Sequence, residues 1–145
     1  MLLDNVTAGA NNRQGRLRAE YISIFTDPHG GYKGMVDVIT SRVPPNQFVQ
    51  LLSQYRAVLS PPGRGYDCFR TWQALAVGSI PMVVKDDDFD PRLFEESGAC
   101  YIPKPAALTP LILAELLDGL HDPAPAHGNK SQLDWWQRKW ESYLQ

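Results

Sequence analysis

Short apolar runs separated by helical stretches are the feature that most constrains the fold of this chain. The clearest run is Ile80–Val84, which has the length and the apolar content of a strand buried on both faces. The other predicted strands lie at Met1–Val6, Met35–Ile39, Ala57–Ser60 and Cys100–Ile102. Because helical stretches separate these strands, the pattern predicts βαβ units and a parallel sheet with both faces covered. The expected fold class is therefore α/β, a Rossmann-like domain of three layers.

Helical periodicity fills most of the intervals between the strands. The expected helices lie over Arg16–Phe25, Gln47–Gln54, Cys68–Val77, Leu108–Leu120 and Ser131–Leu144, with a short one near Pro91–Glu96. Asn46 and Asp67 are predicted to cap the second and third helices, since each carries a side-chain acceptor at the helix start. Gly78 is expected to end the third helix. We expect one domain over residues 1–145: a core over 1–121, a linker over 122–130 and a C-terminal helix over 131–145.

Composition excludes several classes of protein. Fourteen basic and sixteen acidic residues give a net charge of −2, so no strong positive field would attract a nucleic acid. No apolar run approaches the roughly 20 residues of a membrane helix, and no signal peptide is expected at the N-terminus. Two cysteines, Cys68 and Cys100, cannot build a disulfide framework, although one bridge is possible. The three histidines show no metal-ligand spacing, so no metal site is expected.

The loop and helix after Ala57–Ser60 carry the most chemical information. Parallel sheets bind ligands beyond the carboxyl ends of their strands, which points to the loops after Val6, Ser60 and Val84. Gly63 and Gly65 would let a ligand approach the backbone, and the following helix presents free N–H groups. Arg70 lies in the first turn, where its charge opposes the helix dipole unless an anion binds there. The same residues also fit a tight turn, with Arg70 paired to a surface carboxylate.

The segment Tyr55–Val84 resembles the donor-binding segment of exostosin-type glycosyltransferases (family 47-like, including ribitol xylosyltransferase-like proteins). The shared pattern includes Ser60-Pro61-Pro62-Gly63-Arg64-Gly65-Tyr66-Asp67, then Arg70-Thr71-Trp72-Gln73-Ala74-Leu75, and finally Gly78-Ser79-Ile80-Pro81-Met82-Val83-Val84. Asn12–Arg16 resembles, more loosely, the basic turn after the first strand of that domain. The resemblance implies the C-terminal half of a GT-B fold. Such a half binds a nucleoside diphosphate sugar, here expected to be a UDP-sugar, and no metal or other cofactor is implied.

Residue by residue, the resemblance implies two parts of a donor site. The donor diphosphate would be bound by Gly63, Arg64, Gly65, Arg70 and Arg16. The ribose and the sugar would be bound by Gln73, Asp67 and Asp86. Gln73 stands where the family usually has Glu, so a charge-assisted bond to the ribose is lost. Phe69 stands where many relatives have His.

The resemblance also implies a catalytic base, an acceptor and a cellular location, which no motif of this chain specifies. No catalytic base is identified; the family's two-domain layout implies that it lies on an N-terminal acceptor domain, in the same or a separate chain, or at the cleft between the two halves. The acceptor would be a carbohydrate or glycoprotein hydroxyl, and the family resemblance implies the Golgi or secretory lumen of a eukaryote. The alternative is a non-catalytic module that binds a nucleotide sugar or a protein partner.

An acidic run, Asp86-Asp87-Asp88-Phe89-Asp90, invites a metal interpretation. An Asp-x-Asp pair holds manganese and diphosphate in GT-A transferases. The resemblance to GT-B enzymes, in which arginines and a helix N-terminus take the diphosphate charge, favours an exposed acidic turn instead.

Overall fold

Five parallel strands form the sheet at the centre of the structure, a computed structural model that describes residues 1–4, 13–62, 65–66, 68–87, 89–94 and 97–120. The strands are β1 (Leu2–Asp4), β2 (Asp37–Ile39), β3 (Ala57–Ser60), β4 (Ile80–Val84) and β5 (Cys100–Ile102). The helices are α1 (Arg13–Thr26), α2 (Pro45–Leu52), α3 (Phe69–Ala76) and α4 (Pro110–Asp118), with 3₁₀ turns η1 (Pro91–Leu93) and η2 (Pro105–Ala107). The strand order is β2-β1-β3-β4-β5, and every neighbouring pair is parallel. The α/β, Rossmann-like prediction is confirmed.

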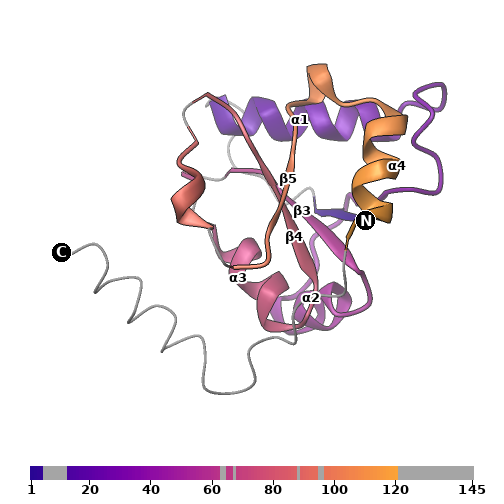
Figure 1. Cartoon of the computed structure of the whole chain (residues 1–145). Helices are drawn as coiled ribbons and strands as arrows, with labels where there is room; N and C mark the ends of the chain where they lie inside the picture. Colours follow the sequence, from indigo (N-terminus) through magenta and orange to yellow (C-terminus); the bar gives the residue numbers. More distant parts are fainter. Residues whose placement is uncertain (5–12, 63–64, 67, 88, 95–96, 121–145) are drawn as a thin grey trace.

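Helices cover both faces of the sheet and make three layers (Figure 1). Leu3, Leu59 and Met82 belong to the larger core, which lies under α1 and α4. Val58 packs on the opposite face against residues of α2 and α3. Every residue of β3 and β4 is buried, which explains why these two strands read as continuous apolar runs rather than alternating ones.

Strand boundaries follow the sequence more closely than helix starts do. The predicted bounds of β3, β4 and β5 are confirmed, because each apolar run is bordered by turn residues. Gly78 follows α3 with a φ of 82°, a left-handed conformation that favours glycine and ends the helix as predicted.

Two predicted helix caps are wrong. The N-cap of α2 is Pro44, and Asn46 lies inside the helix, because Pro45 already has the helical φ at the first position. The N-cap of α3 is Cys68 rather than Asp67, which lies outside the described residues. In both cases the helix start is set by backbone geometry rather than by the nearest polar side chain.

The described residues test the expectations about a disulfide and a membrane helix. Cys68 and Cys100 are both free thiols, so they do not form the bridge that the sequence left open. Over the same residues, no helix is long and apolar enough to cross a membrane. The predicted linker over 122–130 and C-terminal helix over 131–145 lie outside the described residues.

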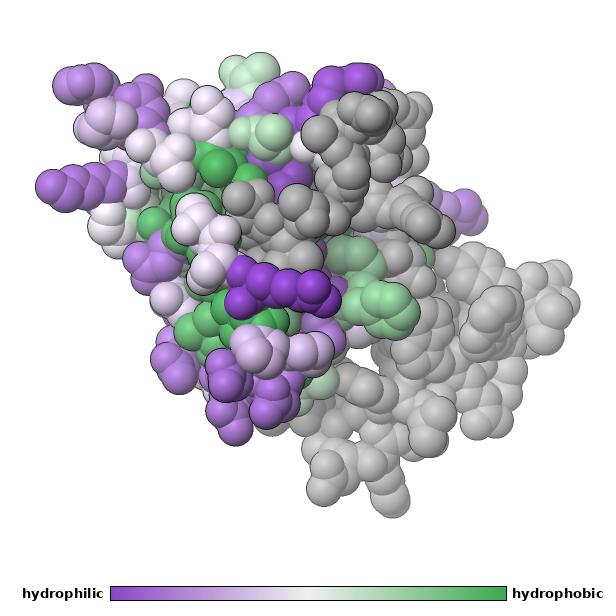
Figure 2. Space-filling view, turned by 180° about the vertical axis from the view of Figure 1, so that it is seen from behind, coloured by the Kyte–Doolittle hydropathy of each residue, from purple (hydrophilic) through white to green (hydrophobic). Residues whose placement is uncertain are grey.

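Seen from behind, the surface shows hydrophobic patches set among hydrophilic side chains (Figure 2).

Candidate functional site at the carboxyl edge of the sheet

The strand order places a topological switch point between β1 and β3. The chain leaves β1 toward β2 on one side, while β3 is followed by β4 on the other. Accordingly α1 covers one face and α3 covers the opposite face, and both begin at the carboxyl edge of the sheet. Ligands of open parallel sheets bind in the crevice at such a point. The loop after β3, singled out from the sequence, therefore lies at the expected position for a ligand.

A buried hydrogen-bonded cluster fixes the start of α3 against the end of β3. Ser60, the last residue of β3, lies 2.8 Å from Thr71 Oγ1 through its Oγ atom and 3.1 Å from Cys68 Sγ. Thr71 Oγ1 also lies 3.4 Å from Cys68 Sγ, and the Thr71 N–H donates to the Cys68 carbonyl at 3.1 Å. Ser60 and Thr71 are almost completely buried. The first turn of α3 is therefore held in a fixed place above the sheet edge.

The electrostatics of this helix start favour negative charge. Burial raises the pKa of the Cys68 thiol, but hydrogen bonds from Ser60 and Thr71 and the positive charge of Arg70 outweigh it, and the pKa lies below its ordinary value. Arg70 is half-buried, its Nε atom is fully buried, and the residue interacts with neighbours. The hydrogen-bond donors and the positive charge that stabilise a thiolate at this helix start would also stabilise the oxygens of a bound anion.

Gly65 has open space in front of it. A Cβ added at this residue would meet no atom within 4 Å, and its φ is not in the left-handed region. Neither packing nor backbone conformation within the described residues therefore requires a glycine here. Close approach of a ligand to the backbone is a reason to have one.

Three further residues of α3 lie near Arg70 in the chain. Gln73 follows it by one helical turn, so the two residues are neighbours along one side of the helix, and Gln73 is half-buried. Phe69, the first residue of α3, is 88% exposed. Trp72 packs on Phe94 with 5.7 Å between the ring centroids.

A hydrogen bond joins the loop after β3 to the loop after β4. Tyr66, in the loop after β3, donates a hydrogen bond from its hydroxyl to Asp86 Oδ1, in the loop after β4. The Tyr66 ring packs edge-on against Phe89 with 5.2 Å between centroids. Phe89 is buried and also contacts Phe94 and Tyr101. An aromatic cluster thus supports the hydroxyl–carboxylate pair from below.

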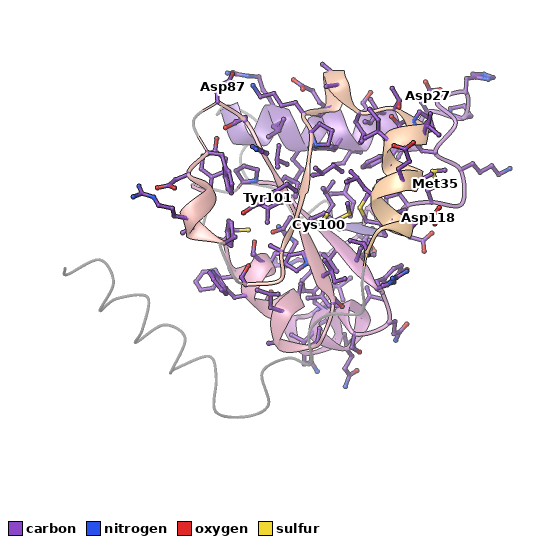
Figure 3. The ribbon with its side chains drawn as sticks, in the orientation of Figure 1. Asp27, Met35, Asp87, Cys100, Tyr101 and Asp118 are labelled. Atoms are coloured by element: carbon purple, nitrogen blue, oxygen red, sulfur yellow. The ribbon has the colours of Figure 1, made fainter. Side chains whose placement is uncertain are left out.

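The rest of the acidic run differs from Asp86. Asp87 is almost completely exposed and pairs with Lys104 at 3.2 Å, and Figure 3 shows it on the loop after β4. Asp27, Met35 and Asp118 lie at the opposite end of the molecule in the same view. Among the described residues no group of three His, Cys, Asp or Glu side chains is arranged to hold a metal ion.

The arginines of α1 take different environments. Arg16 lies in the first turn of the helix and is exposed, whereas Arg18 is only 5% exposed. Arg18 shares a helix face with Tyr21, whose hydroxyl donates to the carbonyl of Pro103 just beyond β5. Because α1 runs back from the carboxyl edge, Arg18 lies closer to that edge than Tyr21 does.

The structure brings some of the predicted site residues together. Arg70 and Gln73 share α3, and Asp86 lies in the adjoining loop. Arg16 comes from the helix on the opposite face of the sheet. Gly63, Arg64 and Asp67 lie outside the described residues.

The sequence gave no role to Tyr66, Cys68 or Arg18. For Arg18 the available signal was its charge on the same helix face as Tyr21 and Phe25.

No protein-family model matches this chain, and no curated protein matches it.

Proposed function

We propose that this chain binds a nucleoside diphosphate sugar, expected to be a UDP-sugar, at the junction of the β3 loop and α3. In this proposal it is the donor domain of a glycosyltransferase with a GT-B layout. The observation that carries the proposal is the start of α3, where the buried hydroxyls of Ser60 and Thr71 hold the first helical turn against the end of β3 and Arg70 lies in that turn. It is supported by the position of this helix start, at the switch point of a parallel sheet.

The proposed chemistry is transfer of a glycosyl group without a metal. The acceptor hydroxyl oxygen forms a bond to the anomeric carbon, the bond from that carbon to the diphosphate oxygen breaks, and the hydroxyl proton passes to a base on an acceptor domain. Arg70 and the N–H groups of α3 stabilise the charge on the leaving diphosphate. Gly63, Arg64, Gly65 and Arg16 complete the diphosphate side of the site.

Gln73 and Asp86 bind the remaining parts of the donor in this proposal. Gln73 is one turn along α3 from Arg70, where its amide meets the ribose hydroxyls. Asp86 and Asp67 accept hydrogen bonds from hydroxyls of the sugar. A carboxylate is suited to this because it offers acceptors only.

An NMR titration of the ¹⁵N-labelled chain with UDP and with GDP tests the proposal. We expect shifts concentrated at Tyr66, Arg70 and Thr71, with the amides near Gly30 and Lys33 at the amino edge unchanged. Absence of shifts at about 1 mM nucleotide, or shifts spread evenly over both edges, would refute it.

A second function is favoured by Gln73 itself. An amide at the position where the resembling family has a carboxylate fits a module that binds a nucleotide sugar, or a protein partner, without turnover. We expect Gln73→Glu to tighten UDP binding by about tenfold if the site is a donor site that has lost one charged contact. Unchanged UDP affinity in Gln73→Glu would favour a site for a different ligand.

A further inference from the structure

A tyrosine–aspartate hydrogen bond joins the loops after two neighbouring strands at the carboxyl edge. Tyr66 and Asp86 lie 20 residues apart in the chain, and both are half-buried. The contact is made between side chains of the loops that follow β3 and β4, and these two strands pair directly in the sheet. Asp86 is thereby held at a fixed place beside the loop that leads into α3.

Buried aromatic rings support this pair. Phe89, 8% exposed, packs edge-on against the Tyr66 ring and is itself stacked on Phe94. The Phe89 N–H donates to the Asp86 carbonyl at 3.2 Å, so the same turn positions both the aromatic support and the carboxylate. The packing of the ring places the Tyr66 hydroxyl at the Asp86 carboxylate, where it donates to Oδ1.

We propose that Tyr66 is a positioning residue that orients the Asp86 carboxylate to accept hydrogen bonds from hydroxyls of the donor sugar, and that the pair thereby distinguishes sugars. The inference rests on the proposed function. With the diphosphate at the start of α3, the sugar extends toward the neighbouring strand, one spacing of about 4.8 Å away, where Asp86 lies. A carboxylate offers hydrogen-bond acceptors only, which suits it to hydroxyl donors.

A second tyrosine–aspartate hydrogen bond, at the amino edge of the sheet, serves as a control for a merely structural role of Tyr66 and Asp86. Tyr55, just before β3, donates from its hydroxyl to Asp37 Oδ2 at 2.9 Å, at the start of β2. Both pairs join a tyrosine hydroxyl to an aspartate carboxylate and connect segments far apart in the chain. The Tyr55 bond is exposed and the Tyr66 bond is partly buried, so Tyr55→Phe controls for the loss of a tyrosine–aspartate bond away from the proposed site.

The experiment is calorimetric titration of the wild-type chain, Tyr66→Phe and Tyr55→Phe with UDP, UDP-glucose, UDP-xylose and UDP-N-acetylglucosamine. Phenylalanine keeps the ring on Phe89 and removes only the hydroxyl. We expect at least one UDP-sugar to bind the wild type more tightly than UDP does. Tyr66→Phe should weaken that UDP-sugar by about tenfold and leave UDP within about twofold, whereas Tyr55→Phe should change neither.

The outcomes separate the two proposals. If the wild type binds neither UDP nor any of the sugars, the proposed function fails, and this inference fails with it. If UDP binds but no UDP-sugar binds more tightly, the positioning role alone is overturned. It is also overturned if Tyr66→Phe weakens UDP and UDP-sugar equally, or if Tyr55→Phe has the same effect as Tyr66→Phe.

Discussion

Replacing Thr71 by valine tests whether the buried cluster holds the start of α3. Thr71 is fully buried, and its Oγ1 atom lies 2.8 Å from Ser60 Oγ and 3.4 Å from Cys68 Sγ. Valine has nearly the same shape, so the substitution removes the hydroxyl without opening a cavity. The loss then comes from the hydrogen bonds and from incomplete pairing of Ser60. Such a change costs about 1–3 kcal/mol in free energy of unfolding.

Urea denaturation followed by circular dichroism measures this cost. With a slope of about 2 kcal/mol per molar urea, a loss of about 2 kcal/mol lowers the midpoint by about 1 M. Thr26→Val is the control, because Thr26 is exposed at the end of α1 although its Oγ1 also bonds a backbone carbonyl, at 2.7 Å. We expect the control to change the free energy of unfolding by less than about 0.5 kcal/mol.

A double-mutant cycle separates the cluster from the general effect of burial. Ser60→Ala combined with Thr71→Val should cost less than the sum of the two single changes, since each removes a partner of the other. Additive costs, or a Thr71→Val cost no larger than that of Thr26→Val, would refute the view that this cluster fixes the helix start.

The remaining predictions concern the thiols and the glycines. Alkylation of Cys68 by iodoacetamide should reach half its maximal rate at a lower pH than that of Cys100, and mass spectrometry of the two peptides distinguishes them. Burial raises the pKa of Cys100, whereas hydrogen bonds from Ser60 and Thr71, together with Arg70, lower the pKa of Cys68. Gly65→Ala should leave the free energy of unfolding within about 0.5 kcal/mol but weaken UDP binding, whereas Gly78→Ala should cost about 1–2 kcal/mol because its φ is 82°. An early Cys100 titration, or a large stability loss in Gly65→Ala, would contradict these assignments.

Strands were predictable from the sequence because their information is local. Ile80–Val84 and Ala57–Ser60 are apolar throughout or nearly so, are flanked by turn residues, and are buried on both faces in the sheet. Helix starts were less predictable. A proline at the first position of α2 and a backbone bond to Cys68 in α3 decided the boundary against the neighbouring Asn46 and Asp67.

The candidate site was only partly predictable for a different reason. Arg70 and Gln73 follow from a local motif, so sequence alone places them on one helix turn. The bond from Tyr66 to Asp86 depends on the pairing of β3 with β4 and on the aromatic cluster that supports it, and no local pattern specifies either. The sequence does not distinguish Arg18 from Arg16, because the two lie on the same helix. The structure distinguishes them, since Arg18 is buried and Arg16 is exposed.

Calorimetric titration of UDP into the wild-type chain and Arg70→Ala tests the proposed donor site most directly. Lys33→Ala, which removes one positive charge from an exposed position before β2, is the charge-matched control. We predict a Kd below about 1 mM for the wild type and for Lys33→Ala, and a Kd at least about tenfold higher for Arg70→Ala. No binding by the wild type, or equal affinity in Arg70→Ala and Lys33→Ala, would contradict a diphosphate site at the start of α3.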